Sequence, residues 1–398
     1  MKRFVCGPSG SGLSEEAWAL ADESGAAWVG NDAAAHITLL RSTVEQELAF
    51  GMEQVGVPPA QMRARIGAIA QQWGLTGILQ RDPSHLSTGQ TRRVAIASAL
   101  LRNPESLVLD CPLDGCDQEA VRTLVQVVDA FPGDVTIFDR TWNELADLCE
   151  VESRYPEGVD INPGVRAAPE HPVSVASAAS ATATALTIHG LTVERDAVTV
   201  GPVSVVIPQG ITHLAGPNGA GKTTLLLALA DLIPRAGGWL SRSTASTPAS
   251  RSTSRDVLSL PYGWVPTAMD SSLLARTVRD EVAVGSSLRN ADAVLEYCGL
   301  QDVAEVHPLD VASSERRIVS LACALVRGPE FLFLDEPTVG LDVYGYRAVE
   351  RIMRGFVAGE VHDLLCARGG TVLGEPTSVV WTCHNGPYSD LSDFRLVL

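Results

Sequence analysis

The sequence has little of what marks proteins that bind nucleic acids. It carries 30 Lys and Arg against 47 Asp and Glu, which gives a formal net charge of −17. Proteins that hold a phosphate backbone usually show a basic surface, because neutralising phosphates supplies much of their affinity. The acidic balance therefore predicts that nucleic acid is not a partner.

Paired cysteines, a leader and long apolar runs are also lacking. The eight cysteines are scattered without a Cys-x-x-Cys pair, which favours reduced thiols in a cytosolic protein over a metal site or a disulfide framework. The N-terminal Met-Lys-Arg is soon followed by Gly-Pro-Ser-Gly, which interrupts any signal peptide. No run of about 18 apolar residues is present that could span a bilayer. We expect a chain that is soluble or is held at a membrane by a partner.

An internal repeat dominates the organisation of the chain. Residues 91–105 lead into a strand that ends at Asp110, and the similar residues 315–330 lead into one that ends at Asp335, so the spacing is 335 − 110 = 225. Residues 43–51 likewise resemble residues 277–285. Each half alternates apolar strands with helices, which is typical of an α/β fold whose mostly parallel sheet is covered on both faces.

The repeat predicts two domains and a tether. Residues 156–185 are rich in Pro, Ala, Ser and Thr and have no apolar periodicity, which is typical of a flexible linker. The predicted domains are residues 1–155 and 186–398. The first is shorter between its glycine-rich turn and residue 43 than the second is over the equivalent stretch, so we expect a trimmed domain.

A phosphate-binding loop is predicted in the second half, between an apolar strand at 211–215 and an apolar helix at 225–232. Its glycines allow successive backbone N–H groups to face an anion at a helix N-terminus. Lys222 is expected to neutralise the β- and γ-phosphates, and the Thr223 hydroxyl to hold Mg²⁺. The candidate residues are Gly216, Pro217, Asn218, Gly219, Ala220, Gly221, Lys222, Thr223 and Thr224.

The first half keeps the glycines of this loop at residues 7–14 but has Leu13 where the second half has Lys222. A neutral branched side chain cannot offset the charge of a phosphate. We expect this turn to be structural, with at most weak nucleotide binding through its backbone.

Three further segments carry a resemblance to ABC ATPases. The segment Leu86, Ser87, Thr88, Gly89 and Gln90 resembles their signature motif. Residues 334–342 resemble their Walker B strand, catalytic glutamate and D-loop, and residues 381–385 resemble their switch-histidine segment. The resemblance implies a P-loop NTPase fold of the ABC type, in two tandem domains that each have a helical subdomain. It also implies ATP and Mg²⁺ as cofactors.

The family's roles carry over to the second half. Asp335 would bind Mg²⁺ together with Thr223, Glu336 would orient or deprotonate the attacking water, and His384 would contact the γ-phosphate. In the first half Cys111 replaces the glutamate, and Asp139 with Arg140 replaces the histidine. A thiol does not serve as a carboxylate base at neutral pH.

The second half has in turn lost its own signature, because residues 311–315 contain neither glycine. In ABC proteins ATP lies between the phosphate loop of one domain and the signature of the other. The two sets of losses therefore imply one competent composite site per chain, formed by an intramolecular head-to-tail pair of domains.

Two positions depart from the family pattern. Counting back from residues 277 and 43 places Thr267 and Ala33 where the family has its Q-loop glutamine, and Arg195 stands near the place of the base-stacking aromatic. Turnover is expected to be slow if Thr267 has to replace the glutamine. A solvated surface arginine is the alternative for Arg195.

The Thr-Val-x-x-Glu-x-Ala-x-Gly segments resemble ATPase components of energy-coupling factor importers of vitamins and metal ions. This resemblance implies transmembrane partners, a T-component and a substrate-binding component, and a location on the inner face of the cell membrane. Two alternatives stay open. One is a soluble tandem ABC ATPase that acts on ribosomes or nucleic acid, and the other is a regulatory ATP-binding protein with low activity.

Overall fold

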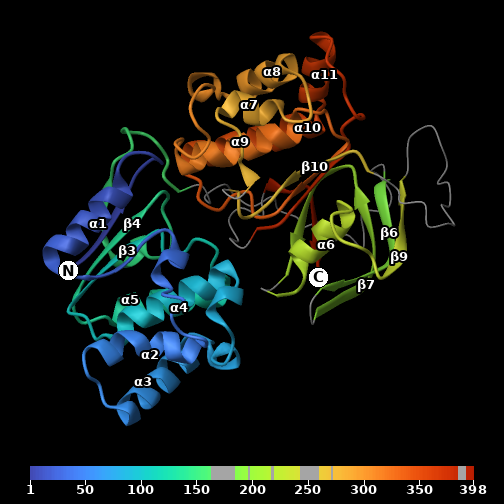
Figure 1. Cartoon of the computed structure of the whole chain (residues 1–398). Helices are drawn as coiled ribbons and strands as arrows, with labels where there is room; N and C mark the ends of the chain where they lie inside the picture. Colours follow the sequence, from blue (N-terminus) through green and yellow to red (C-terminus); the bar gives the residue numbers. More distant parts are fainter. Residues whose placement is uncertain (163–183, 196–197, 217–218, 243–259, 270–271, 384–390) are drawn as a thin grey trace. The chain divides into compact units, whose positions relative to one another are not determined.

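The computed structural model describes residues 1–162, 184–195, 198–216, 219–242, 260–269, 272–383 and 391–398 (Figure 1). The chain divides into two compact units, Met1–Pro163 and Gly164–Leu398, each of which is described by itself. Most of the predicted linker, residues 163–183, lies outside the described residues. The α/β fold with parallel sheets in tandem domains is confirmed.

The first unit is built on a five-stranded parallel sheet in the order β2-β3-β4-β1-β5. Its strands are β1 (Lys2–Cys6), β2 (Ala27–Val29), β3 (Ser106–Asp110), β4 (Asp134–Asp139) and β5 (Glu150–Ser153). The central strands are apolar, and Phe4 and Phe138 are fully buried, as expected for a sheet covered on both faces.

Helices of the first unit begin at clear capping signals. Thr43, Ser87 and Asp117 accept a hydrogen bond from the first turn of α2 (Val44–Gln54), α4 (Thr88–Leu101) and α5 (Gln118–Ala130), respectively. Helix α1 (Leu13–Ser24) packs on β3 and β4, while α2, α3 (Pro59–Gln72) and α4 pack on one another as a helical subdomain. Short 3₁₀ turns occur at Ala33–His36, Thr76–Ile78, Pro83–His85 and Ala146–Leu148.

The second unit repeats this topology, with a parallel sheet in the order β10-β11-β12-β8-β13. Its strands are β8 (Gly210–Ala215), β10 (Tyr262–Val265), β11 (Phe331–Leu334), β12 (Ser378–Trp381) and β13 (Phe394–Val397). An antiparallel sheet of β6 (Thr184–Arg195), β7 (Val198–Pro208) and β9 (Gly237–Arg242) is added to it. Within residues 1–162 this second sheet has no counterpart, so the prediction of a trimmed first domain is correct.

The helices of the second unit follow the same plan. Helix α6 (Lys222–Leu229) opens after the glycine-rich loop, and α7 (Val278–Ala283), α8 (Leu288–Cys298) and α9 (Ser313–Leu325) pack together. A 3₁₀ turn at Gln301–Val303 connects the last two. Helix α10 (Val343–Val357) packs on α9 and α11 (Glu360–Ala367).

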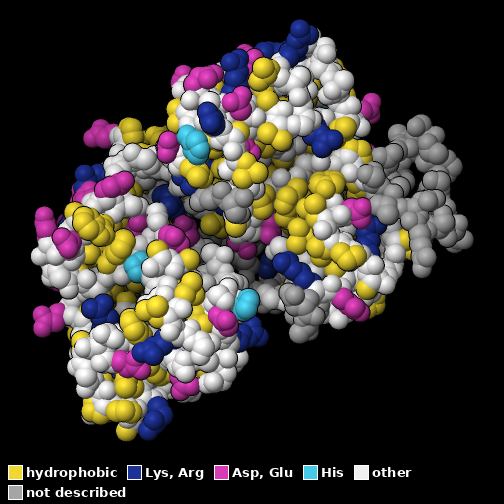
Figure 2. Space-filling view, viewed as in Figure 1, with side chains coloured by type: hydrophobic (Ala, Val, Ile, Leu, Met, Phe, Trp, Pro, Cys, Tyr) yellow, Lys and Arg dark blue, Asp and Glu magenta, His cyan; other side chains and the backbone are white. Residues whose placement is uncertain are grey.

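Polar side chains cover much of the surface of both units. On the face drawn in Figure 2, acidic side chains are spread over the chain with Lys and Arg among them, so the negative charge is not gathered into one patch there. Among the helices of the described residues, none combines the length and apolar character needed to cross a membrane.

Candidate functional site

The glycine-rich loop of the second unit joins β8, an interior strand of the sheet, to α6. Gly216, Gly219 and Gly221 have φ values of 156°, 82° and 90°, which side chains other than glycine rarely adopt. A Cβ on Gly221 would lie 2.3 Å from Val200 Cγ2, so glycine is also required by space. The loop therefore has the backbone shape expected of an anion-binding nest.

Lys222 is the first residue of α6 and is 6% exposed. Its Nζ donates to the carbonyl oxygen of Gly216 at 2.9 Å, so the ammonium folds back over the loop. The lysine, the glycines and the helix N-terminus together fit a bound phosphate group. The predicted loop residues Pro217 and Asn218 lie outside the described residues.

Three threonine hydroxyls converge on one buried carboxylate, Asp335, which directly follows β11. Thr223 donates to Asp335 Oδ2 at 2.9 Å, Thr267 to Oδ2 at 2.7 Å and Thr382 to Oδ1 at 2.9 Å. Hydroxyl and carboxylate oxygens are the ligands that Mg²⁺ prefers, so this donor set fits the ion. The fold thus brings together Thr223 and Asp335, the two residues predicted to hold it.

Glu336 lies next to Asp335 in a left-handed backbone conformation, with φ of 53°. Such a conformation is uncommon for a side chain of this type and is typical of functional sites. Its backbone N–H donates to Thr382 Oγ1 at 2.9 Å. The predicted switch residue His384 lies outside the described residues.

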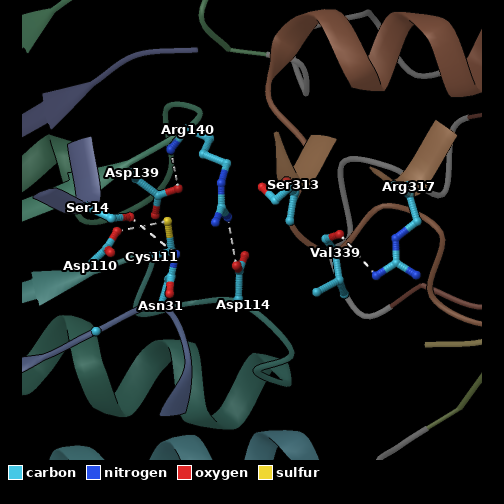
Figure 3. Close-up of polar contacts among 12 residues, drawn as sticks. Ser14, Asn31, Asp110, Cys111, Asp114, Asp139, Arg140, Ser313, Arg317 and Val339 are labelled. Atoms are coloured by element: carbon cyan, nitrogen blue, oxygen red, sulfur yellow. Dashed lines mark hydrogen bonds and ion pairs between the residues drawn. The ribbon is translucent and has the colours of Figure 1, made fainter. Parts of the chain in front are cut away.

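An arginine on α9 positions the segment after β10. Arg317 donates to the carbonyl oxygens of Pro266 at 2.9 Å, Thr267 at 3.1 Å and Val339 at 3.3 Å, the last drawn in Figure 3. Thr267 therefore sits at a fixed point beside Asp335. This is the position at which the sequence analysis placed it.

The equivalent arginine of the first unit corrects one prediction. Arg92 donates to the carbonyl oxygens of Gly30 at 3.0 Å and Asn31 at 2.6 Å, just after β2. Asn31 is therefore the counterpart of Thr267, and the prediction of Ala33 was wrong. The physical reason is a loop two residues longer in the first unit, where Asn31 precedes the helix cap by 12 positions (43 − 31) against 10 (277 − 267) in the second.

The first unit's glycine-rich turn has the same path but a different chemistry. Gly12 has φ of 83° and α1 begins at Leu13, as α6 begins at Lys222 after Gly221. Leu13 is 8% exposed and packs in an apolar cluster with Val5 and Phe138. Its side chain therefore contributes to the core.

An ion pair stands where the second unit has its switch segment. Strand register aligns Ile137 with Trp381, and hence Arg140 with His384. Arg140 donates to Asp114 Oδ2 at 2.9 Å, beside Cys111 and Asp139 (Figure 3). Burial raises the pKa of Cys111 well above its ordinary value and that of Asp139 to about 7. A neutral thiol at this point cannot act as a base.

The signature segment of the first unit is a capped helix start. Ser87 N–H donates to Gln90 Oε1 at 3.1 Å, and Gln90 N–H donates to Ser87 Oγ at 3.4 Å. Ser87 and Thr88 are exposed, Leu86 is half-buried, and Gly89 is buried.

The corresponding segment of the second unit is packed differently. Ser314, at the position of Gly89, is buried and donates to Asp342 Oδ1 at 3.0 Å. A Cβ on Gly345 would lie 1.9 Å from Ser314 Oγ, whereas the first unit has Ala120 at the position of Gly345. Each unit thus has one small and one larger residue at this contact, in opposite order.

Comparisons with known proteins agree with this geometry. A family model described as ABC transporter matches residues 3–114 and 201–339. A candidate ABC transporter ATP-binding protein of Streptomyces coelicolor is 30% identical, with 85% of this chain and 74% of the relative covered. A candidate HMP/thiamine import ATP-binding protein of Bacillus subtilis is 24% identical over 75% of this chain and 64% of its own length.

Solved structures show the same fold at low identity. A structure titled RNase-L Inhibitor matches 100% of this chain and 83% of its own with a TM-score of 0.65 and 18% identity. A chain in a model of ribosome-bound archaeal Pelota and ABCE1 matches 100% of this chain and 72% of its own with a TM-score of 0.70, also at 18% identity.

Proposed function

Since this chain belongs to the ABC transporter family of ATP-hydrolysing proteins, we propose that its second unit carries the hydrolytic site and that hydrolysis drives a transmembrane transporter. The strongest support is the convergence of hydroxyls on Asp335 beside the lysine-bearing loop. The equivalent positions of the first unit hold Leu13 and Cys111, which supply neither a phosphate-neutralising charge nor a carboxylate.

Each residue of the second unit has a distinct proposed role. Lys222 and the loop N–H groups bind the phosphates, Thr223 and Asp335 hold Mg²⁺, Glu336 orients the attacking water, and His384 contacts the γ-phosphate. Bound Mg²⁺ supplies neutralisation of the charge that develops on the transferring phosphoryl group. The contribution of the chain is therefore positioning and electrostatic stabilisation.

The signature segment of the first unit, residues 86–90, is proposed to complete this site in a head-to-tail pair. Its helix start presents exposed Ser87 and Thr88, and the small Gly89 allows close backbone approach. The second unit's own segment has Ser314 bound to Asp342 at the position of that glycine. This contrast favours one competent site over two.

Steady-state ATPase measurements on paired variants test the assignment. Lys222→Ala, Glu336→Gln and Ser87→Arg are each expected to lower the rate on the order of a hundredfold or more. The matched controls change the equivalent positions of the other unit and should stay within about twofold of wild type: Leu13→Met, Cys111→Ser and Ala312→Arg. Full activity in Ser87→Arg, or a large loss in Ala312→Arg, would rule out the composite site.

A transmembrane partner is supported by an exposed leucine repeated in both units. Leu40 and Leu274 are 73% and 86% exposed, and each lies three residues before the threonine that caps the next helix. The loops that carry them are tied by the buried glutamate of the Thr-Val-x-x-Glu segments. Glu281 accepts the N–H of Leu274 at 2.8 Å, and Glu47 accepts the N–H of Thr38 at 2.6 Å. Two apolar side chains on fixed loops suit a partner with two contact points.

Within that role, we favour an energy-coupling factor system that imports a vitamin or a metal ion, with a T-component and a substrate-binding component at the inner face of the membrane. The Bacillus subtilis relative is named for HMP/thiamine import, which is consistent with this class. The tandem fold of RNase-L Inhibitor keeps a ribosome-acting ATPase as the alternative, against which the net charge of −17 stands. A regulatory protein with low turnover is the third possibility.

Co-purification from the native host separates the three. A small polytopic membrane protein that is retained by the wild-type chain and lost from a Leu40→Glu, Leu274→Glu double variant supports the transporter. Exchange of the exposed Leu288, 57% accessible and outside these loops, to Glu is the control. Recovery of ribosomes would support the alternative, and a chain that turns over ATP slowly and retains neither would support the regulatory protein.

A further inference from the structure

Thr382 is a fully buried residue directly after β12, and its hydroxyl contacts both acidic residues of the proposed site. Thr382 Oγ1 donates to Asp335 Oδ1 at 2.9 Å and accepts the backbone N–H of Glu336, also at 2.9 Å. A hydroxyl has a single hydrogen, so donating to Asp335 leaves its lone pairs for Glu336. One side chain thereby links the orientation of a carboxylate to the backbone of its neighbour.

This link acts on two features that the proposed chemistry needs. It holds Asp335 Oδ1, while Oδ2 accepts from Thr223 and Thr267 on the side of the phosphate loop. It also ties the N–H of Glu336, whose left-handed backbone with φ of 53° is unfavourable unless the surroundings support it. Without the hydroxyl, both the carboxylate plane and the turn that aims Glu336 would lose a fixed partner.

The first unit shows the same position without the hydroxyl. Strand register places Phe138 where the second unit has Thr382. There the N–H of Cys111 donates to the backbone carbonyl of Phe138 at 2.8 Å. Asp110 Oδ2 is buried and has no hydrogen-bond partner among the described residues. The hydroxyl is thus present beside the Asp-Glu pair and absent beside the Asp-Cys pair.

We propose that Thr382 is a positioning residue, which orients Asp335 toward the metal and fixes the turn that directs Glu336 at the attacking water. This inference rests on the proposed function of the second unit. It extends that function to a residue that binds neither phosphate nor metal itself.

Two substitutions separate the hydroxyl from the volume of the side chain. Thr382→Val keeps the shape and removes the hydroxyl, and it should lower kcat on the order of tenfold to a hundredfold, the range for losing a hydrogen bond to a charged group. Thr382→Ser keeps the hydroxyl and should stay within about threefold of wild type. Thr212→Val is the matched control, because Thr212 is buried in β8 and its hydroxyl has no partner among the described residues.

Metal binding gives a readout that a merely structural role would not move. We would titrate Mn²⁺ by electron paramagnetic resonance in the presence of a non-hydrolysable ATP analogue, and measure binding of the same analogue in EDTA. Thr382→Val should weaken Mn²⁺ binding about fivefold or more with metal-free analogue binding unchanged. Thr382→Ser and Thr212→Val should bind Mn²⁺ as wild type does.

The outcomes distinguish this inference from the proposed function. If the wild type binds Mn²⁺ with the analogue and Thr382→Val binds it equally well, the role of Thr382 is wrong while the site stands. Loss of binding in Thr382→Ser as severe as in Thr382→Val also overturns it, since the hydroxyl would not be the cause. If the wild type binds no Mn²⁺, or Lys222→Ala hydrolyses ATP normally, the proposed site itself fails.

Discussion

The contact between Ser314 and Gly345 makes a prediction whose size follows from the geometry. A Cβ on Gly345 would lie 1.9 Å from Ser314 Oγ and 3.0 Å from Leu341 Cδ2. The leucine methyl is the end of a flexible side chain and can move, but Ser314 Oγ is held by Asp342 Oδ1 at 3.0 Å. Gly345→Ala therefore forces the serine hydroxyl out of a buried hydrogen bond.

The expected free energies can be summed. Displacing the hydroxyl from its buried partner costs about 1–3 kcal/mol, and alanine in place of glycine within a helix returns about 0.5–1 kcal/mol. Gly345→Ala should thus lower the free energy of unfolding by about 1–2 kcal/mol. In a Ser314→Gly background the hydroxyl is gone and only the helix contribution is left, so the same change should become neutral or slightly stabilising. The first unit, with Gly89 and Ala120, already has this combination.

Hydrogen exchange by mass spectrometry on peptides covering 313–325, at increasing urea, measures these energies within the full chain. The two single variants and the double variant form a cycle with an expected coupling of about 2 kcal/mol. Gly67→Ala is the control, because this exposed helical glycine has nothing within 4 Å of its Cβ position and should gain stability. Additive effects of the two substitutions, within about 0.5 kcal/mol, would refute the matching of sizes.

Two further predictions concern titrating groups. Cys366 is exposed whereas Cys111 is buried with a raised pKa, so a maleimide at neutral pH should label Cys366 rapidly and Cys111 only after unfolding, as peptide mapping would report. Burial raises the pKa of Asp139 from 3.8 to about 7, so between these values the folded chain keeps a proton that the unfolded chain releases. Stability of the first unit should therefore fall as pH rises from about 4 to about 7, by up to about 1.4 kcal/mol per pH unit. Denaturant unfolding of wild type against Asp139→Asn should show a flatter profile in the variant, and parallel profiles would contradict the assignment.

The parts of the site that were predicted from sequence are those encoded by neighbouring residues. The glycine frame and Lys222 are adjacent in the chain and directly determine where β8 ends and α6 begins. The signature serine could likewise be located because the capping box needs a residue three positions on, Gln90. Motifs of this kind are read without knowledge of tertiary structure.

Other parts depend on strand register and loop length, which a single sequence does not display. Thr382 acts on residues 46 and 47 positions away through the pairing of β11 with β12. A polar residue at the end of an apolar strand was the one available signal. Ala33 was misassigned because counting assumed equal loops, and the arginine contact that identifies Asn31 spans 61 residues. The pairing of Ser314 with Gly345 is visible only once α9 and α10 pack together.

The degenerate positions have changed together with their neighbours, and this constrains how the asymmetry can be reversed. A buried arginine left unpaired would cost about 3–5 kcal/mol, so Arg140 requires Asp114, where the second unit has Val339. Cys111→Glu alone would add a carboxylate next to Asp110 and Asp114 without restoring a lysine or the hydroxyl beside it. Restoring hydrolysis to the first unit therefore requires concerted changes at several contacts, so a single reversion should not recover a second active site.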